Sequence, residues 1–127
     1  RLHVDVGSRF PGLISATGRL VAAFGAAPQE EIEKQFTSLR WQKPITMTAW
    51  RKEVESARRA GFSMDNGRYI AGITLIAVPV LDGNQHISHT LVVATIMNQI
   101  SEEKIKTLIH DLKEHAGRIS ASLYPQD

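Results

Sequence analysis

The sequence predicts a single α/β domain in which amphipathic helices accompany a β-hairpin. Apolar residues recur every three or four positions in several stretches, and this spacing is the period of a helix that lies on a core. Two runs rich in β-branched residues, 73–81 and 86–97, are separated by the turn-forming residues 82–85. Such runs around a short polar turn are typical of a hairpin.

The opening of the chain predicts a strand followed by a helix. Residues 2–6 alternate apolar and polar side chains, and residues 7–12 turn the chain. Ser15 is the expected cap of the helix, because its hydroxyl can accept hydrogen bonds from amides two and three residues further on. Gly25 is the expected end. The side chains expected to pack inward are Leu20, Val21, Ala23 and Phe24.

Two more helices are predicted before the hairpin. Pro28 opens the first, and the acidic residues after it suit the positive end of a helix. Its expected core residues are Ile32, Phe36 and Leu39. A connection over residues 41–47 leads to the second helix, from about Ala49 to Ala60, which Gly61 ends. Its buried stripe is expected to contain Trp50, Val54 and Ala57.

Residues 61–72 are expected to form an irregular loop ahead of the hairpin. Gly67 and Gly72 permit backbone angles that residues with a Cβ avoid. The polar side chains of the loop are Asp65, Asn66, Arg68 and Tyr69. A polar loop that runs into an apolar strand has the chemistry of a ligand site.

A last amphipathic helix is predicted after the hairpin. Ser101 is its expected cap, and the acidic residues Glu102 and Glu103 lie in its first turn. Its outer face is charged. The expected apolar seam consists of Ile105, Leu108, Ile109, Leu112, Ala116, Ile119 and Leu123.

Composition excludes several functional classes. With 127 residues, of which 43% are hydrophobic, the chain is long enough for one core. Its 15 basic and 13 acidic residues give no field that would by itself indicate nucleic acid or an acidic membrane surface. The absence of cysteine excludes disulfides, zinc ribbons and thiol nucleophiles. No apolar run approaches the roughly 20 residues of a membrane span, so we expect a cytoplasmic protein without a membrane partner.

The sequence does not favour a metal site or a catalytic site. His86 and His89 are three apart on a predicted strand and point to opposite faces, and His110 and His115 lie about 140° apart around a helix. Neither pair suits one metal ion, and no cofactor is expected. We find no Ser-His-carboxylate arrangement with recognisable signatures and no phosphate loop. We therefore expect no enzyme, with a catalytic domain as an alternative hypothesis.

A set of spaced glycine, proline, apolar and acidic residues covers the loop and the first strand of the hairpin. Its positions are Gly61, Phe62, Asp65, Gly72, Ala77, Pro79, Val80 and Asp82. It resembles the C-terminal effector-binding domain of IclR-type transcriptional regulators, and the resemblance extends to Val6-Gly7, Pro11 and Gly18-Arg19. The implied fold is GAF-like, an antiparallel sheet flanked by helices. In such regulators a winged helix-turn-helix precedes this domain. Nothing here reads as one, so we expect residues 1–127 to be an effector-binding domain, incomplete at its N-terminus, of a longer protein.

The resemblance also implies where an effector would bind. It places effector contacts at Ala16, Thr17, Asp65, Leu75, Val92 and Ala94. If Ser15 caps its helix, the amides of Ala16, Thr17 and Gly18 are unpaired within the helix at its positive end, which suits a carboxylate. Val92 and Ala94 are two apart on a strand and share one face. Tyr69 adds a phenol from the loop.

Departures from the family indicate which effector this chain would take. Relatives that bind small polar keto acids tend to carry hydroxyl or thiol groups at the positions of Leu75, Val92 and Ala94, and an acidic residue at Gly67 or Arg68. Apolar side chains at these positions favour an acid with an aromatic or aliphatic body. The expected partners are therefore a small carboxylic acid effector and further copies of the chain in a dimer or tetramer. DNA would be contacted only through the missing N-terminal domain.

Simpler structural explanations exist for each of these residues. Asp65 can be a turn residue that bonds its own backbone. Leu75, Val92 and Ala94, which we call the wall, can belong to a sheet core. Arg19 and Arg68 could pair with a ligand carboxylate, although an exposed arginine is the commoner state. We expect replacement of Asp65 by Ala to weaken effector binding and to cost no more than about 1 kcal/mol of stability. A dimerisation module without a ligand is a further alternative.

Overall fold

The computed structural model of the chain describes residues 16–37 and 45–126. Several features predicted from the sequence lie outside these ranges: the strand at residues 2–6, the turn at 7–12, the motif residues Val6-Gly7 and Pro11, the cap Ser15, the core residue Leu39 and residues 41–44 of the predicted connection. The side chain of Phe36 is not described either.

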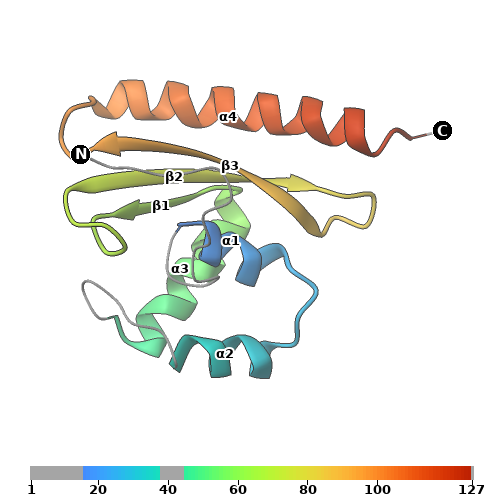
Figure 1. Cartoon of the computed structure of the whole chain (residues 1–127), viewed down its shortest axis with the longest axis horizontal. Helices are drawn as coiled ribbons and strands as arrows, with labels where there is room; N and C mark the ends of the chain where they lie inside the picture. Colours follow the sequence, from blue (N-terminus) through green and yellow to red (C-terminus); the bar gives the residue numbers. More distant parts are fainter. Residues whose placement is uncertain (1–15, 38–44, 127) are drawn as a thin grey trace.

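The described chain forms a three-stranded antiparallel sheet flanked by helices (Figure 1). The strand order is β1-β2-β3, so β2 is central. Helix α4 covers one face of the sheet, helices α1 and α3 cover the other, and α2 lies beyond α1 and α3 (Figure 1). This confirms the predicted fold class. The elements are α1 Ala16–Phe24, α2 Gln29–Thr37, α3 Met47–Ala60, β1 Ser63–Asn66, β2 Ile73–Leu81, β3 Ile87–Ile96 and α4 Glu102–Leu123.

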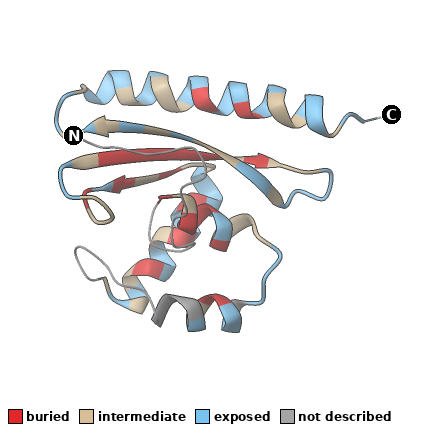
Figure 2. Cartoon of the chain, in the orientation of Figure 1, coloured by how far each residue is buried: buried red, intermediate tan, exposed pale blue. Residues whose placement is uncertain are grey.

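Strand β2 is buried on both faces (Figure 2). Because side chains alternate along a strand, its residues contribute to two separate cores. Toward α1 and α3 the buried cluster consists of Ala16, Leu20, Ala57, Leu75 and Ala77. Toward α4 it consists of Ile76, Val78, Val80, Leu112 and Ala116. The central strand therefore joins the two helical layers of the domain.

Helix α1 is buried on two sides, which explains an error in the predicted core. Leu20 packs toward the sheet, and Ala22 packs with Ile32 and Trp50 of helices α2 and α3. Val21 was predicted to point inward but is 37% exposed. The sheet packs on one face of α1, and helices α2 and α3 pack on another, so its buried side chains lie on both of these faces. Val21 lies outside them and is open to solvent.

Helix α3 begins two residues earlier than predicted. The side chain of Thr46 accepts a hydrogen bond from the amide of Ala49 at 3.1 Å, so the helix starts at Met47. Its predicted end is confirmed, because Gly61 has φ 76° and donates its amide to the carbonyl of Ala57. The predicted stripe of Trp50, Val54 and Ala57 is buried.

Helix α4 agrees with the sequence prediction over most of its length. The Ser101 hydroxyl accepts from the amide of Lys104 at 3.2 Å, which confirms this cap. Leu112 and Ala116 are buried against β2. Leu123, predicted as part of the seam, is half-exposed in the last turn of the helix. The Ser120 hydroxyl donates to the carbonyl of Leu81 at 2.5 Å and joins this end of α4 to the end of β2.

The hairpin of β2 and β3 is confirmed, whereas β1 was not predicted. Asp82 organises the hairpin turn, since its carboxylate accepts from the amides of Asn84 at 2.8 Å and His86 at 3.1 Å. β1 lies within the segment predicted as an irregular loop and pairs with β2 from Ser63↔Ala77 to Asn66↔Thr74. The remaining loop returns to β2 through Gly67 and Gly72, which have φ of 78° and 81°.

Candidate functional site

The residues predicted to contact an effector lie on one side of the sheet. Leu75 pairs with Ala94 on β3 and with Asp65 on β1. Ala77, on the same face of β2, pairs with Val92. Because directly paired residues share a face, Asp65, Leu75, Val92 and Ala94 all point toward the layer that contains α1.

Strand β3 presents an exposed apolar row on this face. The row consists of Val92, Ala94 and Ile96, and the exposed fractions are 46% for Val92 and 62% for Ile96. Leu75, on the neighbouring strand, is 8% exposed and belongs to the core. The wall is therefore buried at β2 and open at β3. The alternative that Leu75, Val92 and Ala94 are ordinary core residues is therefore correct only for Leu75.

The first turn of helix α1 lies beside this wall. Ala16 is fully buried and packs in the same cluster as Leu75. Thr17 is half-buried, and Gly18 is buried. The first amides of a helix have no partners within it and form the positive end of its dipole. The geometry thus combines an apolar surface with the positive end of a helix.

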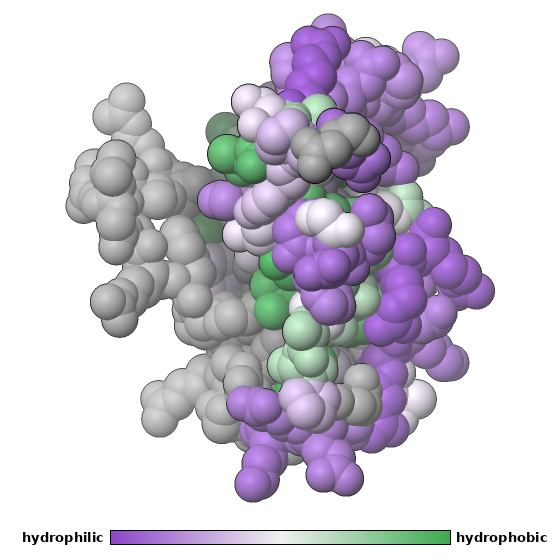
Figure 3. Space-filling view, turned by 90° about the vertical axis from the view of Figure 1, so that its right-hand side faces the viewer, coloured by the Kyte–Doolittle hydropathy of each residue, from purple (hydrophilic) through white to green (hydrophobic). Residues whose placement is uncertain are grey.

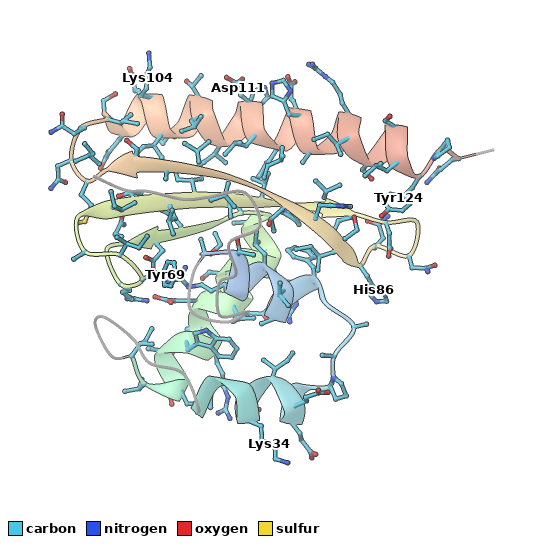
Figure 4. The ribbon with its side chains drawn as sticks, in the orientation of Figure 1. Lys34, Tyr69, His86, Lys104, Asp111 and Tyr124 are labelled. Atoms are coloured by element: carbon cyan, nitrogen blue, oxygen red, sulfur yellow. The ribbon has the colours of Figure 1, made fainter. Side chains whose placement is uncertain are left out.

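Tyr69 lies on the loop between β1 and β2, on the side of the sheet that faces α1 and α3 (Figure 4). Its half-buried side chain packs against the cluster of Ala16, Leu20 and Leu75. Burial raises the pKa of the Tyr69 phenol above its ordinary value. The phenol is therefore neutral at physiological pH, and a neutral phenol can donate a hydrogen bond.

Asp65 is fully buried beneath the loop, and its carboxylate has several donors. Oδ2 accepts from the amides of Arg68 at 3.2 Å and Tyr69 at 3.1 Å. Oδ1 accepts from Nη2 of Arg19 at 3.2 Å. These contacts make Asp65 a structural residue of the loop, and they correct the expectation that its replacement would have little effect on stability. A direct contact between Asp65 and a ligand would require this arrangement to open.

Arg19 is the centre of a buried polar network that was not predicted. Its Nε donates to Glu53 at 2.8 Å, and its Nη1 donates to the Ser63 hydroxyl at 3.1 Å and to the Met64 carbonyl at 3.0 Å. Arg68 pairs with the other oxygen of Glu53. The expectation that exposure is the commoner state of an arginine does not hold for Arg19, because its side chain is 4% exposed. Its donors are used within the protein and not by a ligand.

One sequence signal could have revealed this network. A buried carboxylate requires a cation or several donors, and a cation on the face of a helix that packs on the sheet is a candidate partner for Asp65. Arg19 follows Ala16 by three positions and precedes Leu20, so it lies on the helix face that packs on the sheet. Glu53 carried no comparable signal, because it lies among several charged residues of α3.

No group of three residues with metal-ligating side chains occurs within residues 16–37 and 45–126. No helix in the described part of the chain has the length and apolarity that crossing a lipid bilayer requires.

Comparison with known proteins identifies related sequences. Residues 1–121 match the family model described as the C-terminal domain of the bacterial transcriptional regulator IclR. The chain is 25% identical over 116 residues to the probable transcriptional regulator SauR of Cupriavidus necator, covering 89% of this chain and 46% of SauR. It is 25% identical over 128 residues to the DNA-binding transcriptional repressor YiaJ of Escherichia coli, covering 97% of this chain and 45% of YiaJ. The chain thus spans about half the length of these curated relatives.

Solved structures share the fold. An IclR transcriptional regulator from Alicyclobacillus acidocaldarius superposes with a TM-score of 0.83 at 25% identity, covering 95% of this chain and 49% of that one. The inducer-binding domain of PobR from Acinetobacter, a double mutant in complex with 3-hydroxybenzoic acid, superposes with a TM-score of 0.76 at 18% identity. That match covers 91% of this chain and 69% of the PobR chain and concerns the fold alone.

Proposed function

Because the chain belongs to the IclR family of bacterial transcriptional regulators, as the match over residues 1–121 shows, we propose that it senses a small carboxylic acid for a longer regulator. In this proposal, effector binding takes place in this domain, and DNA is bound by another part of the whole protein. The relatives are transcriptional regulators and not enzymes.

The observation that carries the proposal is the exposed apolar row of Val92, Ala94 and Ile96 on β3, on the sheet face that carries helix α1. Solvent-exposed apolar side chains in a row are unfavourable unless a ligand or another chain covers them. The nearby amides of Ala16, Thr17 and Gly18 favour an anion at that place. We call this region, formed by Thr17, Tyr69, Leu75, Val92 and Ala94, the mouth.

The chemistry of the mouth supports an acid with an apolar body. Val92 and Ala94 have no polar group that could replace the water around a very small, polar acid. An aromatic or short aliphatic body would cover them, and each methylene buried would contribute up to about 0.8 kcal/mol. In PobR, a domain of the same fold is in complex with an aromatic acid, 3-hydroxybenzoic acid.

Asp65 has an indirect part in this proposal. Its carboxylate accepts hydrogen bonds from the amides of Arg68 and Tyr69 and thereby fixes the loop that carries the Tyr69 side chain. Self-association as a dimer or tetramer remains part of the proposal. The same exposed row would also suit contact with another chain, which keeps a dimerisation module as the alternative.

Thermal unfolding with a panel of acids tests the proposal. Ligands that bind only the folded state raise its stability with concentration, by about 2.7 kcal/mol at 100 times the dissociation constant. We expect benzoate or a short aliphatic acid to stabilise the chain without being consumed. The Ala94→Glu variant should lose this effect, because it places a negative charge in the mouth.

His89→Glu is the matched control, since it places the same charge on an exposed position of β3 that the proposal leaves outside the mouth. Equal loss in both variants, or no stabilisation by any acid, would contradict the proposal. A change of oligomeric state in Ala94→Glu without any acid effect would instead support the dimerisation module.

A further inference from the structure

A groove lies at the end of β2 away from the mouth, between the C-terminal end of α3 and helix α4. Its volume is about 440 Å³, within the range of about 300–1,000 Å³ that is common for small-molecule sites. The lining side chains that matter here are Arg58, Arg59, Lys113, Phe24, Pro79 and Leu81. We propose that this groove binds a small organic dianion with an apolar body, independently of the mouth.

The cations of the groove come from two different elements. Arg58 and Arg59 lie in the last turn of α3, and Lys113 lies on α4. No acidic residue is among the lining residues in the described part of the chain. Arg58 is ion-paired with Glu55, outside the lining, which leaves Arg59 and Lys113 as two cations without an acidic partner in the described structure. Two such charges around a single depression favour a ligand with two negative charges.

Much of the donor capacity of these cations is unused within the described structure. Arg58 donates a hydrogen bond from Nε to the carbonyl of Ala23 and another from Nη1 to the carboxylate of Glu55. Its Nη2 group is left to donate to a ligand. Lys113 donates one of its three protons to the carbonyl of Ala60 at 2.6 Å. The guanidinium of Arg59 makes no hydrogen bond or ion pair with the residues that the structure describes. Several N–H groups can therefore reach an anion.

The position of these cations at a helix end explains only part of the cluster. The carbonyls at the C-terminal end of α3 favour nearby positive charge, and Lys113 caps one of them directly. Lys113 also lies 5.6 Å from the centre of the Phe62 ring. Arg59 lies in the same last turn, where the helix dipole favours positive charge, but its guanidinium has no carbonyl partner among the described residues and so can still bind an anion.

An apolar floor completes the groove. Apart from the cations, its lining includes Phe24, Val78, Pro79, Leu81 and Ala116. Figure 3 views the molecule from the hairpin end and shows hydrophobic atoms at the surface between hydrophilic elements above and below. A flat or branched carbon body would cover such a floor, while its anionic groups meet the cations at the rim.

The groove and the mouth are separate places on the molecule. The groove is lined by the Val78–Leu81 end of β2, whereas the mouth lies around Leu75 and its partner Ala94. A ligand of one site therefore does not occupy the other.

A nitrogen-15 NMR titration of the whole chain with phthalate, benzoate and benzyl alcohol tests the proposal. These probes share an aromatic ring and differ in charge. We expect phthalate to shift the amides of Gly61 and Gly117, which line the groove, more strongly than benzoate does. Benzyl alcohol should leave both amides unchanged. The effect of phthalate should weaken as salt is added, because the cations are partly exposed.

Arg59→Gln should weaken phthalate binding about three- to fivefold, the effect of losing one partly exposed ion pair. Arg118→Gln is the matched control, because Arg118 is an exposed arginine of α4 that does not line the groove. The rest of the NMR spectrum reports whether each variant keeps the fold.

Phthalate shifts confined to the amides of Val92 and Ala94, or equal loss in both arginine variants, would overturn the proposal. Benzoate acting at Val92 and Ala94 while the amides of Gly61 and Gly117 stay silent would remove the groove site and leave the proposed function intact.

Discussion

Arg19 and Asp65, which are 46 positions apart in the sequence, form an ion pair that is almost completely excluded from solvent. Nη2 of Arg19 lies 3.2 Å from Oδ1 of Asp65. The second carboxylate oxygen accepts from the amides of Arg68 and Tyr69. A single carboxylate thus connects helix α1 to the loop beside the mouth.

Replacement of Arg19 by Met should strongly destabilise the domain. It would leave Asp65 buried with no cation and remove one of the two partners of Glu53. Loss of one partner from a buried pair costs about 3–5 kcal/mol. We expect the free energy of unfolding, measured by denaturant titration, to fall by about 3 kcal/mol or more.

Arg51→Met provides the control for this substitution, because Arg51 pairs with Glu33 at an exposed position. Its effect should stay within about 1 kcal/mol. Similar losses in the two variants would show that burial of the Arg19 network contributes little.

Asp65→Ala should loosen the loop as well as lower stability. The loss should be about 3 kcal/mol, larger than the sequence alone led us to expect, because Arg19 would remain buried beside an empty position. Hydrogen exchange gives a specific measurement. The amides of Arg68 and Tyr69 should exchange faster, while that of Leu112 in α4 should change only as far as global stability changes. Unchanged exchange at Arg68 and Tyr69 would contradict this role.

Replacement of Val92 and Ala94 together by Ser should change the effector preference. The two hydroxyls would offer hydrogen bonds to a small polar acid and remove apolar contact from a larger one. Calorimetric titration of both proteins with benzoate, pyruvate and glyoxylate should show the wild type preferring benzoate and the double variant shifted toward the keto acids. A wild type that prefers glyoxylate would show that the wall is placed wrongly.

Asp82 should make the hairpin sensitive to acid. The amides of His86 and Asn84 donate to its carboxylate and lower its pKa. A lowered pKa in the folded state contributes stability above the unfolded pKa of about 3.9, and this contribution is lost as pH falls through the folded value. Asp82→Asn should therefore be less stable than wild type at pH 7, and the difference should shrink toward about pH 2. A constant difference across this range would contradict the assignment.

Three glycines should respond differently to replacement by Ala. At Gly67, φ is 78° and a Cβ would lie 3.0 Å from Sδ of Met97, so we expect a loss of about 1 kcal/mol or more. Gly72 has φ 81° with nothing within 4 Å, so its loss reflects the backbone alone. Gly117→Ala should stabilise the domain by about 0.5–1 kcal/mol, because it lies in α4 with free space around it. Thermal unfolding ranks the three variants.

Local signals explain which parts of the fold could be predicted from the sequence. The bounds of β2 were predicted correctly, because a continuous apolar run is bounded by Gly72 and by the Asp82 turn. Ser101 and Gly61 mark helix ends through groups within a few residues of them. Each of these features depends on residues that are adjacent in the sequence.

Features that depend on distant contacts could not be predicted in the same way. β1 has only four residues, of which Met64 alone is apolar, so it lacks the apolar run that identified β2. Its partner strand and Arg19 stabilise it from elsewhere in the chain. The wall of the candidate site was predicted from a resemblance, but its exposure at Val92 depends on which elements cover β3.

The bond from Arg19 to the carbonyl of Met64 also affects how the molecule meets its neighbours. In the described sheet β1 is an edge strand, and the free carbonyls and amides of such a strand can pair with a strand of another molecule. The guanidinium of Arg19 donates a hydrogen bond to one carbonyl of β1, that of Met64, at 3.0 Å. A strand of another molecule could therefore not pair with β1 at Met64 unless it displaced the guanidinium of Arg19.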